Sequence, residues 1–181
     1  VVHRDVSPQN IIVTFDGVVK LVDFGVAKAE GRLHQTRAGL IKGKFAYMSP
    51  EQVGGGRVDG RSDIFALSEV FYELLLQRHP FYAPSDMEVL RAIIDNDPPH
   101  PTALQANFPA ELGEILMRAM RKTPGDRYAT AGRMREAIDR YVGRRNAATQ
   151  KMLGRYISDL FHDRLQLEQE ARDAGDDAAL I

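Results

Sequence analysis

The sequence has no cysteine, which excludes a disulfide scaffold, thiolate metal sites and a cysteine nucleophile. It also has no excess of charge of one sign, because 24 Lys and Arg residues balance 25 Asp and Glu residues and the formal net charge is -1. A dedicated nucleic-acid binder needs a basic excess to displace counterions, so we expect no nucleic acid among the partners. With 181 residues, 44% of them hydrophobic and 27% charged, the composition is instead typical of one soluble globular domain.

A long hydrophobic run is also lacking. The most apolar window, from Ile64 to Leu76, has thirteen residues and contains Ser68 and Glu69. It is too short and too polar to cross a bilayer. The first residues, Val1 to Asp5, lack the order of a signal peptide, in which a charged stretch precedes an apolar one. We therefore expect a cytoplasmic protein with no membrane segment.

The order of patterns along the chain predicts a short hairpin followed by helices. Asn10–Phe15 and Val18–Val22 are rich in β-branched residues, and Asp16-Gly17 between them is a turn signal. Residues 27–60 hold seven glycines and show no periodicity, which indicates a long functional loop. The helices that we expect are a buried one over 63–76 with Ser62 or Asp63 as N-cap, and amphipathic ones over 86–94, 112–120 and 131–142, the last opened by Thr130.

The last forty residues differ in character. Five apolar residues follow helical spacing and form one stripe, which either packs against the preceding part of the chain or binds a partner. The stripe consists of Leu153, Tyr156, Ile157, Leu160 and Phe161. Residues 162–181 carry six acidic and two basic side chains, and we expect this tail to fray. A basic stretch over 118–145 is best explained as a solvated helical face, with a partner or acidic lipids as the alternative.

Five short motifs occur in a fixed order. They are His3-Arg4-Asp5 followed by Asn10, Asp23-Phe24-Gly25, Ser49-Pro50-Glu51, Ser62-Asp63 and Asp126-Arg127-Tyr128. Their order and spacing resemble the protein kinases, whose catalytic loop, magnesium-binding motif, end of the activation segment, central helix and late arginine they match. Their local flavour, with Met48 to Gln52 and Val6 to Asn10, looks like a bacterial serine/threonine kinase of the eukaryotic-like type.

This resemblance implies a mainly α-helical carboxy-terminal kinase lobe with a small catalytic β-hairpin. Residues 1–142 would form that lobe, with the catalytic loop, activation segment and helical subdomain, and residues 143–181 an amphipathic helix and acidic tail. The residues before His3 include no glycine-rich loop, strand lysine or partner glutamate. We therefore expect the amino-terminal lobe to be missing from this chain, through a misplaced start or a split gene, or to lie on a separate chain.

The resemblance also implies a site for ATP and Mg²⁺ and a protein substrate phosphorylated on Ser or Thr. Asp5 would accept or orient the proton of the attacking hydroxyl. Asn10 and Asp23 would supply oxygen ligands to the magnesium that holds the β- and γ-phosphates. Ile12 would form the floor of the adenine pocket.

A regulatory phosphate is a further implication. Arg4, beside the catalytic aspartate, can pair with a phosphate on the activation segment. Thr36 is the only hydroxyl-bearing residue between Asp23 and Tyr47, so it is the candidate phosphosite. The alternative is a solvated loop threonine with no such role.

Other matched residues are expected to be architectural. By resemblance, Glu51 and Arg127 form a buried ion pair, and the Asp63 carboxylate accepts backbone N–H groups of the catalytic loop. Phe24 and Gly25 complete the magnesium-binding motif as structural residues.

Two positions depart from the family pattern. Two residues after the catalytic aspartate, serine/threonine kinases usually carry a lysine that contacts the transferred phosphate, and here the residue is Ser7. Seven residues before Glu51 they usually carry a threonine, and here it is Lys44. The hydroxyl and the ammonium have exchanged places, so we expect Lys44 to supply the positive charge at the phosphate. In the alternative, Lys44 points into solvent.

The sequence leaves two functions open. Retention of Asp5, Asn10 and Asp23 favours an enzyme, because a lobe kept only for binding has no chemical need for all three. The missing amino-terminal lobe favours a non-catalytic, pseudokinase-like interaction module. An upstream reading frame with a glycine-rich loop and a strand lysine would decide for the enzyme.

Overall fold

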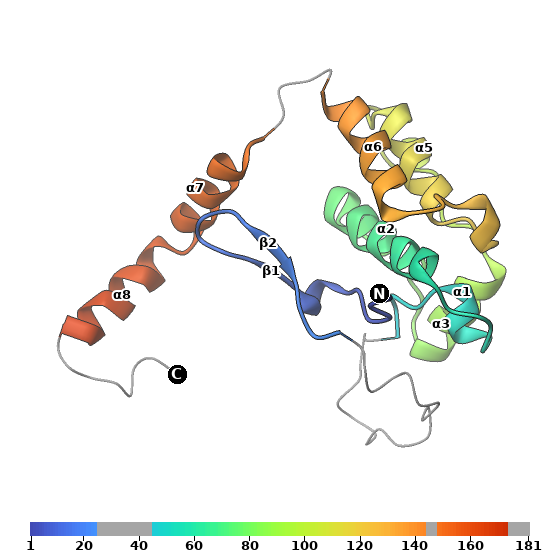
Figure 1. Ribbon diagram of the computed structural model, residues 1–181, viewed down its shortest axis with the longest axis horizontal. Helices are drawn as coiled ribbons and strands as arrows, with labels where there is room; N and C mark the ends of the chain where they lie inside the picture. The colour runs from blue at the N-terminus through green and yellow to red at the C-terminus, as the bar shows by residue number, and fades with distance from the viewer. Residues whose placement is uncertain (25–44, 144–147, 174–181) are drawn as a thin grey trace. The chain divides into compact units, whose positions relative to one another are not determined.

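A computed structural model describes residues 1–24, 45–143 and 148–173 (Figure 1). The chain forms two compact units, Val1–Asn10 with Val22–Asn146 and Ile11–Leu21 with Ala147–Ile181. The described residues form one two-stranded sheet and are otherwise mainly helical, so the predicted fold class is confirmed. The hairpin shares its unit with the carboxy-terminal helices, whereas we predicted a domain boundary between residues 142 and 143; that boundary stays a prediction.

Helix α2 (Gly60–Leu76) is the central element of the first unit. It begins earlier than predicted, because the Asp59 carboxylate accepts the Arg61 N–H at 2.9 Å and serves as the N-cap. The prediction of Ser62 or Asp63 as the cap was wrong, and both lie in the first turn of the helix. The middle of α2 is buried as predicted, but its last turn exposes Leu74 and Leu75.

Two amphipathic helices, α5 (Ala110–Ala119) and α6 (Ala131–Val142), pack against α2 and against each other (Figure 1). The predicted cap of α6 is confirmed, since the Thr130 hydroxyl accepts the Arg133 N–H at 3.2 Å. Apolar side chains from all three helices form two adjoining clusters. Their fully buried members include Ile64, Phe65, Tyr72, Leu116, Ala119, Met120 and Met134.

The remaining helices of the first unit are short. Among the described residues they are η1 (Pro8–Asn10), α1 (Pro50–Val53), α3 (Asp86–Asp95), α4 (Pro101–Leu104) and η3 (Pro124–Asp126). Four of these five begin at a proline, whose fixed φ suits the first turn of a helix and which disfavours a helical conformation in the residue before it. The stretch predicted to be irregular therefore contains α1, while its residues 27–44 lie outside the described part of the chain.

The second unit contains the predicted hairpin. Strands β1 (Ile11–Val13) and β2 (Val19–Leu21) pair antiparallel, with Ile12 opposite Lys20. Gly17 in the turn has a φ of 78°, which favours glycine. Helices α7 (Gln150–Leu160) and α8 (His162–Asp173) follow in the same unit. The expectation that the chain frays from residue 162 was therefore wrong as far as residue 173. No helix in the described part of the chain is long and apolar enough to span a membrane.

One carboxyl group is buried in the core of the first unit. Glu69 on α2 has no exposed surface, and neither of its oxygens has a hydrogen-bond partner among the described residues. The nearby Lys122 amine instead donates to the Ile93 carbonyl at 2.6 Å. Burial raises the pKa of Glu69 well above 4.5, although the charges of Lys122 and Arg127 act in the opposite direction.

We predict that Glu69→Leu raises the free energy of unfolding by about 1–3 kcal/mol, because the substitution removes a buried polar group without a partner. The pH dependence follows from the raised pKa of Glu69 in the folded state. The stability that the protonated form provides is fully present below pH 4.5 and is lost as the pH rises through the folded-state pKa. Urea unfolding at a series of pH values measures both effects.

The matched control is Glu69→Gln, which keeps the shape and polarity of the side chain and cannot ionise. The difference in stability between the native chain and this variant should grow as the pH rises above 4.5. If that difference is constant with pH and Glu69→Leu lowers the stability, Glu69 has a partner in solution and the prediction is wrong.

Candidate active site

The segment that begins with His3 is held by the first turn of α2. The Asp63 carboxylate accepts the backbone N–H of His3 at 2.8 Å and that of Arg4 at 2.7 Å. Arg4 has a φ of 67°, a left-handed conformation that is unfavourable for an arginine. The Gln52 side chain, on α1, donates to the Arg4 carbonyl at 2.9 Å. Contacts from two helices therefore maintain the strained residue that precedes Asp5.

The His3 ring connects this segment to the one that contains Asp23. The Asp5 N–H donates to His3 Nδ1 at 3.3 Å, so the ring proton lies on Nε2, which donates to the Val22 carbonyl at 3.0 Å. The His3 and Phe24 rings lie 4.7 Å apart. His3 is 3% exposed, and these contacts give it the structural position that suits a residue without a catalytic role.

Asn10 lies beside Asp5. Its amide Nδ2 donates to the Asp5 carbonyl at 2.6 Å and to the Asp5 carboxylate at 3.2 Å. Asn10 is buried at the end of η1, and its backbone N–H donates to the Ser7 carbonyl at 3.0 Å. Because Nδ2 is engaged by Asp5, the Asn10 Oδ1 atom is the part of the amide that could face a cation.

Asp23 lies directly beyond the end of the hairpin. The preceding N–H, that of Val22, donates to the Asn10 carbonyl at 2.9 Å, so the chain brings Asn10 and Asp23 to the same end of the two strands. Asp23 has a φ of 56°. Among the described residues only Arg4, Asp23 and Gln77 are non-glycine residues with a positive φ. Two of the three belong to the predicted site, since Asp23 is a predicted magnesium ligand and Arg4 directly precedes Asp5, and backbone strain commonly concentrates at functional sites.

Of the other predicted site residues, the structure describes some and not others. Ile12 lies on β1 and is 46% exposed. Ser7 is 1% exposed, and its hydroxyl has no hydrogen-bond partner within the part of the chain that the structure describes. Gly25, Thr36 and Lys44 lie outside the described residues. The predicted contact between Ser7 and Lys44 therefore stays a prediction.

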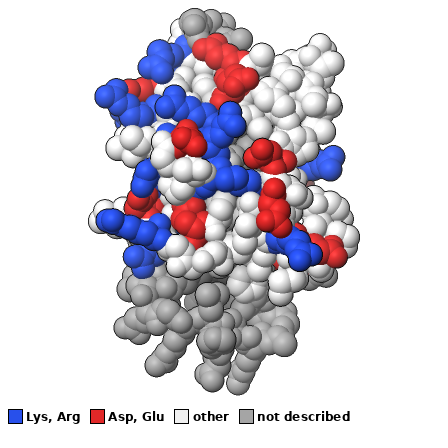
Figure 2. All heavy atoms as spheres, turned by 90° about the vertical axis from the view of Figure 1, so that its right-hand side faces the viewer, with Lys and Arg blue, Asp and Glu red and all other residues white. Residues whose placement is uncertain are grey.

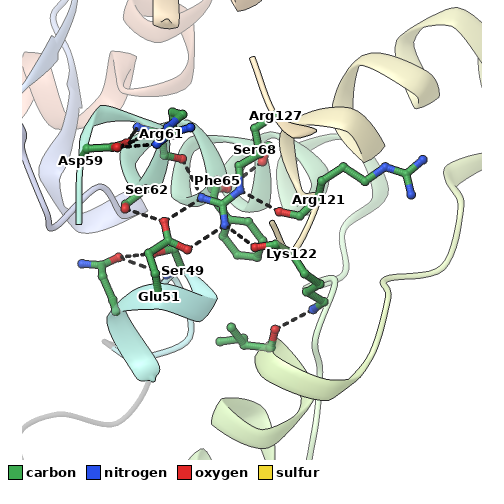
Figure 3. Close-up of polar contacts among 12 residues, drawn as sticks. Ser49, Glu51, Asp59, Arg61, Ser62, Phe65, Ser68, Arg121, Lys122 and Arg127 are labelled. Carbon is green, nitrogen blue, oxygen red and sulfur yellow. Dashed lines mark hydrogen bonds and ion pairs between the residues drawn. The ribbon is translucent and has the colours of Figure 1, made fainter. Parts of the chain in front are cut away.

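The ion pair between Glu51 and Arg127 joins segments far apart in the sequence (Figure 3). The two terminal nitrogens of Arg127 donate to the two oxygens of Glu51, each at 2.7 Å. The remaining three N–H groups of the guanidinium donate to the carbonyls of Arg121, Arg61 and Lys122. All five donors of an arginine are thus satisfied, and the Arg127 side chain has no exposed surface.

Glu51 is also the acceptor of a hydroxyl group, because Ser62 Oγ donates to it at 2.5 Å. Burial by itself would raise the pKa of Glu51, but the hydrogen bonds from Arg127 and Ser62 outweigh it and lower the pKa. Glu51 and Arg127 thus form the ion pair that we predicted from the resemblance. The purely architectural role that we assign to this pair stays a prediction.

Sequence reasoning missed Gln52, whose amide holds the Arg4 carbonyl. A signal was available, because Ser49 and Gln52 have the spacing of a capping box. In the structure Gln52 Oε1 accepts the Ser49 N–H at 3.0 Å, which aligns the rest of the amide with the segment after His3.

The surface over α5 and α6 carries charges of both signs. Figure 2 shows Lys and Arg side chains gathered over part of the visible face with Asp and Glu side chains among them. A cavity of about 480 Å³ opens there, and the charged residues that line it are Glu111, Glu114, Arg118, Arg121, Asp126 and Arg140. The balance of three acidic and three basic residues gives this cavity no net charge that would select a ligand of one sign.

Comparison with known proteins assigns the chain to a family. The protein kinase domain family matches residues 1–140. The match covers well over half of the chain, and the chain therefore belongs to the protein kinase family. This confirms the resemblance drawn from the five motifs.

The relatives include bacterial kinases of the eukaryotic-like type. The chain is 43% identical over 162 residues to the tyrosine-protein kinase MasK of Myxococcus xanthus, a match that covers 89% of this chain and 25% of that protein. It is 41% identical over 130 residues to the serine/threonine-protein kinase PknL of Mycobacterium tuberculosis, covering 72% of this chain and 33% of PknL. For the serine/threonine-protein kinase PknB of the same species, identity is 37% over 142 residues, covering 77% and 23%. The chain thus spans about a quarter to a third of the length of these relatives.

Proposed function

We propose that this chain carries the catalytic loop of a serine/threonine protein kinase, which transfers the γ-phosphate of ATP to a hydroxyl of a protein substrate. The observation that supports the proposal most is the arrangement of Asp5, Asn10 and Asp23. Asn10 donates to Asp5 directly, and Asp23 follows Val22, whose backbone N–H donates to the Asn10 carbonyl. A carboxylate that positions the attacking hydroxyl, beside two side chains that supply oxygen ligands to magnesium, is the combination that phosphoryl transfer needs.

Each residue has a separate task in this proposal. Asp5 orients the substrate hydroxyl and accepts its proton, and a carboxylate suits the task because it is ionised at neutral pH. Asn10, through Oδ1, and Asp23, through its carboxylate, would hold Mg²⁺, with Ile12 below the adenine base. When bound, magnesium neutralises charge on the β- and γ-phosphates. ATP is an intracellular nucleotide, so we place the reaction in the cytoplasm.

The available ligands suit magnesium. No group of three or more His, Asp and Glu side chains gathers in the described ranges of the chain. Magnesium does not require such a cage, because it is usually bound by one or two protein oxygens together with phosphate oxygens and water. One carboxylate and one amide oxygen therefore fit a magnesium ion that arrives with a nucleotide.

The proposal is tested in an enzyme completed by joining the amino-terminal lobe of a serine/threonine kinase such as PknL before Val1. Labelled γ-phosphate transfer to a mixed peptide library, followed by identification of the phosphorylated amino acids, measures both activity and specificity. We expect phosphoserine and phosphothreonine, formed only with Mg²⁺. Phosphotyrosine alone would contradict the proposed serine/threonine specificity; the relative named a tyrosine-protein kinase, MasK, is the precedent for that outcome. No transfer at all would favour the interaction module.

A prediction concerns Ser7 and Lys44. If Lys44 supplies the charge at the transferred phosphate, Lys44→Ala should lower the turnover number of the completed enzyme about 100-fold, as loss of one preorganised charge typically does. Ser7→Lys alone should also be harmful, because two ammonium groups would repel each other at one site. The buried Ser7 hydroxyl, which has no partner among the described residues, supports a partner from elsewhere in the chain.

The double variant provides the control. Ser7→Lys combined with Lys44→Thr rebuilds the common family arrangement, so it should recover much of the activity that Lys44→Ala loses. A double-mutant cycle on the two positions should be strongly non-additive. Additive effects, or a silent Lys44→Ala, would show that Lys44 is a solvated loop residue.

A further inference from the structure

The turn of the hairpin and helix α7 meet backbone to backbone. A Cβ atom built on Gly17 would lie 2.0 Å from the Gln150 carbonyl oxygen, and one built on Gly154 would lie 2.8 Å from the Phe15 carbonyl oxygen. Real Cβ atoms do not approach backbone atoms this closely, so each contact requires a glycine. Gly17 and Gly154 are the buried residues of a unit that is otherwise partly exposed in its described residues.

Side chains reinforce this contact on both sides of the two glycines. The Gln150 amide donates to the Asp16 carbonyl at 3.1 Å, at the first turn of α7. Beyond the last turn, the Phe161 ring meets the Phe15 ring edge to face, with 6.2 Å between the ring centres. The turn of the hairpin is thus fixed to α7 at the start, the middle and the end of the helix.

The opposite end of the hairpin carries the two predicted magnesium ligands. Asn10 immediately precedes β1, and Val22 and Asp23 immediately follow β2. The Val22 N–H to Asn10 carbonyl bond, 2.9 Å long, closes the hairpin at that end. The strands have only three residues each, and an isolated hairpin of this size is at best marginally stable in water.

We propose that α7 acts as a clamp on the hairpin, which sets the separation of Asn10 and Asp23 and thereby the affinity of the site for magnesium-bound nucleotide. Gly154 and Gly17 are positioning residues, since they lie at the opposite end of the hairpin from Asn10 and Asp23 and act on them only through the hairpin. The effect on nucleotide affinity rests on the proposed function, whereas the clamp itself does not. The match to MasK covers 89% of this chain. Even if every unmatched residue lies at the carboxyl end, the match includes Leu160, the last residue of α7. A sequence shared over α7 supports a shared role for this helix.

The test compares Gly154→Leu with Arg155→Leu in the full 181-residue chain. Leucine at 154 collides with the backbone of Phe15, whereas leucine at the exposed Arg155 introduces the same side chain one residue away. Because leucine favours helix more than glycine does, undocking in the first variant cannot come from a weaker helix. Amide hydrogen exchange by NMR then follows the hairpin, with Val22 reporting the end that carries Asn10 and Asp23, and α2 reporting global unfolding.

We expect exchange at Val22 and Val18 to become about ten-fold faster or more in Gly154→Leu. Exchange in α2 should be unchanged, and Arg155→Leu should match the native chain throughout. Titration with Mg²⁺ and ADP, followed by the amide shifts of Asn10 and Asp23, should give a higher Kd for Gly154→Leu only. If Gly154 only stabilised the fold as a whole, amide exchange in Gly154→Leu would become faster in α2 as well as in the hairpin. Exchange in α2 therefore distinguishes a general loss of stability from undocking of α7.

Unchanged hairpin exchange in Gly154→Leu would overturn the clamp, whatever the nucleotide data show. Faster exchange with an unchanged Kd would overturn the link from the clamp to the site. If the native chain shows no shift at Asn10 or Asp23 with millimolar Mg²⁺ and ADP, the link from the clamp to the site fails, while the exchange data still decide the clamp. The proposed function is decided separately, by phosphate transfer in the completed enzyme.

Discussion

Arg127→Ala should lower the free energy of unfolding by about 3–5 kcal/mol, because it leaves the Glu51 carboxylate buried without its partner. The loss is expected to be large for a second reason. Three backbone carbonyls, those of Arg61, Arg121 and Lys122, also lose the donors that Arg127 supplies. Urea unfolding of the 181-residue chain, monitored by circular dichroism, measures the change.

Arg133→Ala is the matched control, since Arg133 also pairs with a glutamate but at an exposed site. Its bond to Glu136 is 2.9 Å long, and the two side chains are 69% and 47% exposed. We expect a change of no more than about 1 kcal/mol there. Similar losses for the two arginines would show that burial of the Glu51–Arg127 pair is not what makes it important.

Asp23→Ala should abolish phosphate transfer by the completed enzyme, because it removes the carboxylate that we assign to magnesium. The fold should be kept. The contacts that hold this end of the hairpin come from the His3 ring and the Val22 backbone and do not use the Asp23 carboxylate. Initial rates at saturating Mg²⁺ and ATP, together with the thermal unfolding midpoint, measure the two outcomes.

Asp86→Ala serves as the control for this substitution, because Asp86 is an exposed aspartate in the first turn of α3. It should leave the rate unchanged. Residual activity in Asp23→Ala that higher magnesium concentrations restore would be compatible with a ligand role. Activity equal to that of the native enzyme at low magnesium would contradict it.

The hairpin and the main helices could be predicted because their signals are local. Asp16-Gly17 between two β-branched runs specifies a tight turn, and Thr130 marks the start of α6 three residues before Arg133, whose N–H it accepts. The start of α2 was predicted less well. Three polar residues, Asp59, Ser62 and Asp63, are all acceptable N-caps, and local pattern alone does not choose among them.

The site could be assembled from sequence only through motif resemblance, and the contacts that position it were beyond reach. Gln52 meets Arg4 across 48 residues, and Gln150 meets Asp16 across 134 residues. Nothing local in the sequence links the members of such a pair. The sequence predicted a buried helix over 63–76 but did not single out Glu69, because glutamate is almost never fully buried without a partner.

The central claim is that the residues of this lobe divide into a chemical group, with Asp5, Asn10 and Asp23, and an architectural group, with Glu51 and Arg127. The most direct test makes Asp23→Ala and Arg127→Ala separately in the completed enzyme. Turnover and the thermal unfolding midpoint are both measured on each purified variant. We predict that Asp23→Ala loses turnover at an unchanged midpoint, whereas Arg127→Ala lowers the midpoint and keeps turnover at temperatures where it remains folded. A lower midpoint for Asp23→Ala with full turnover per folded molecule would contradict the division.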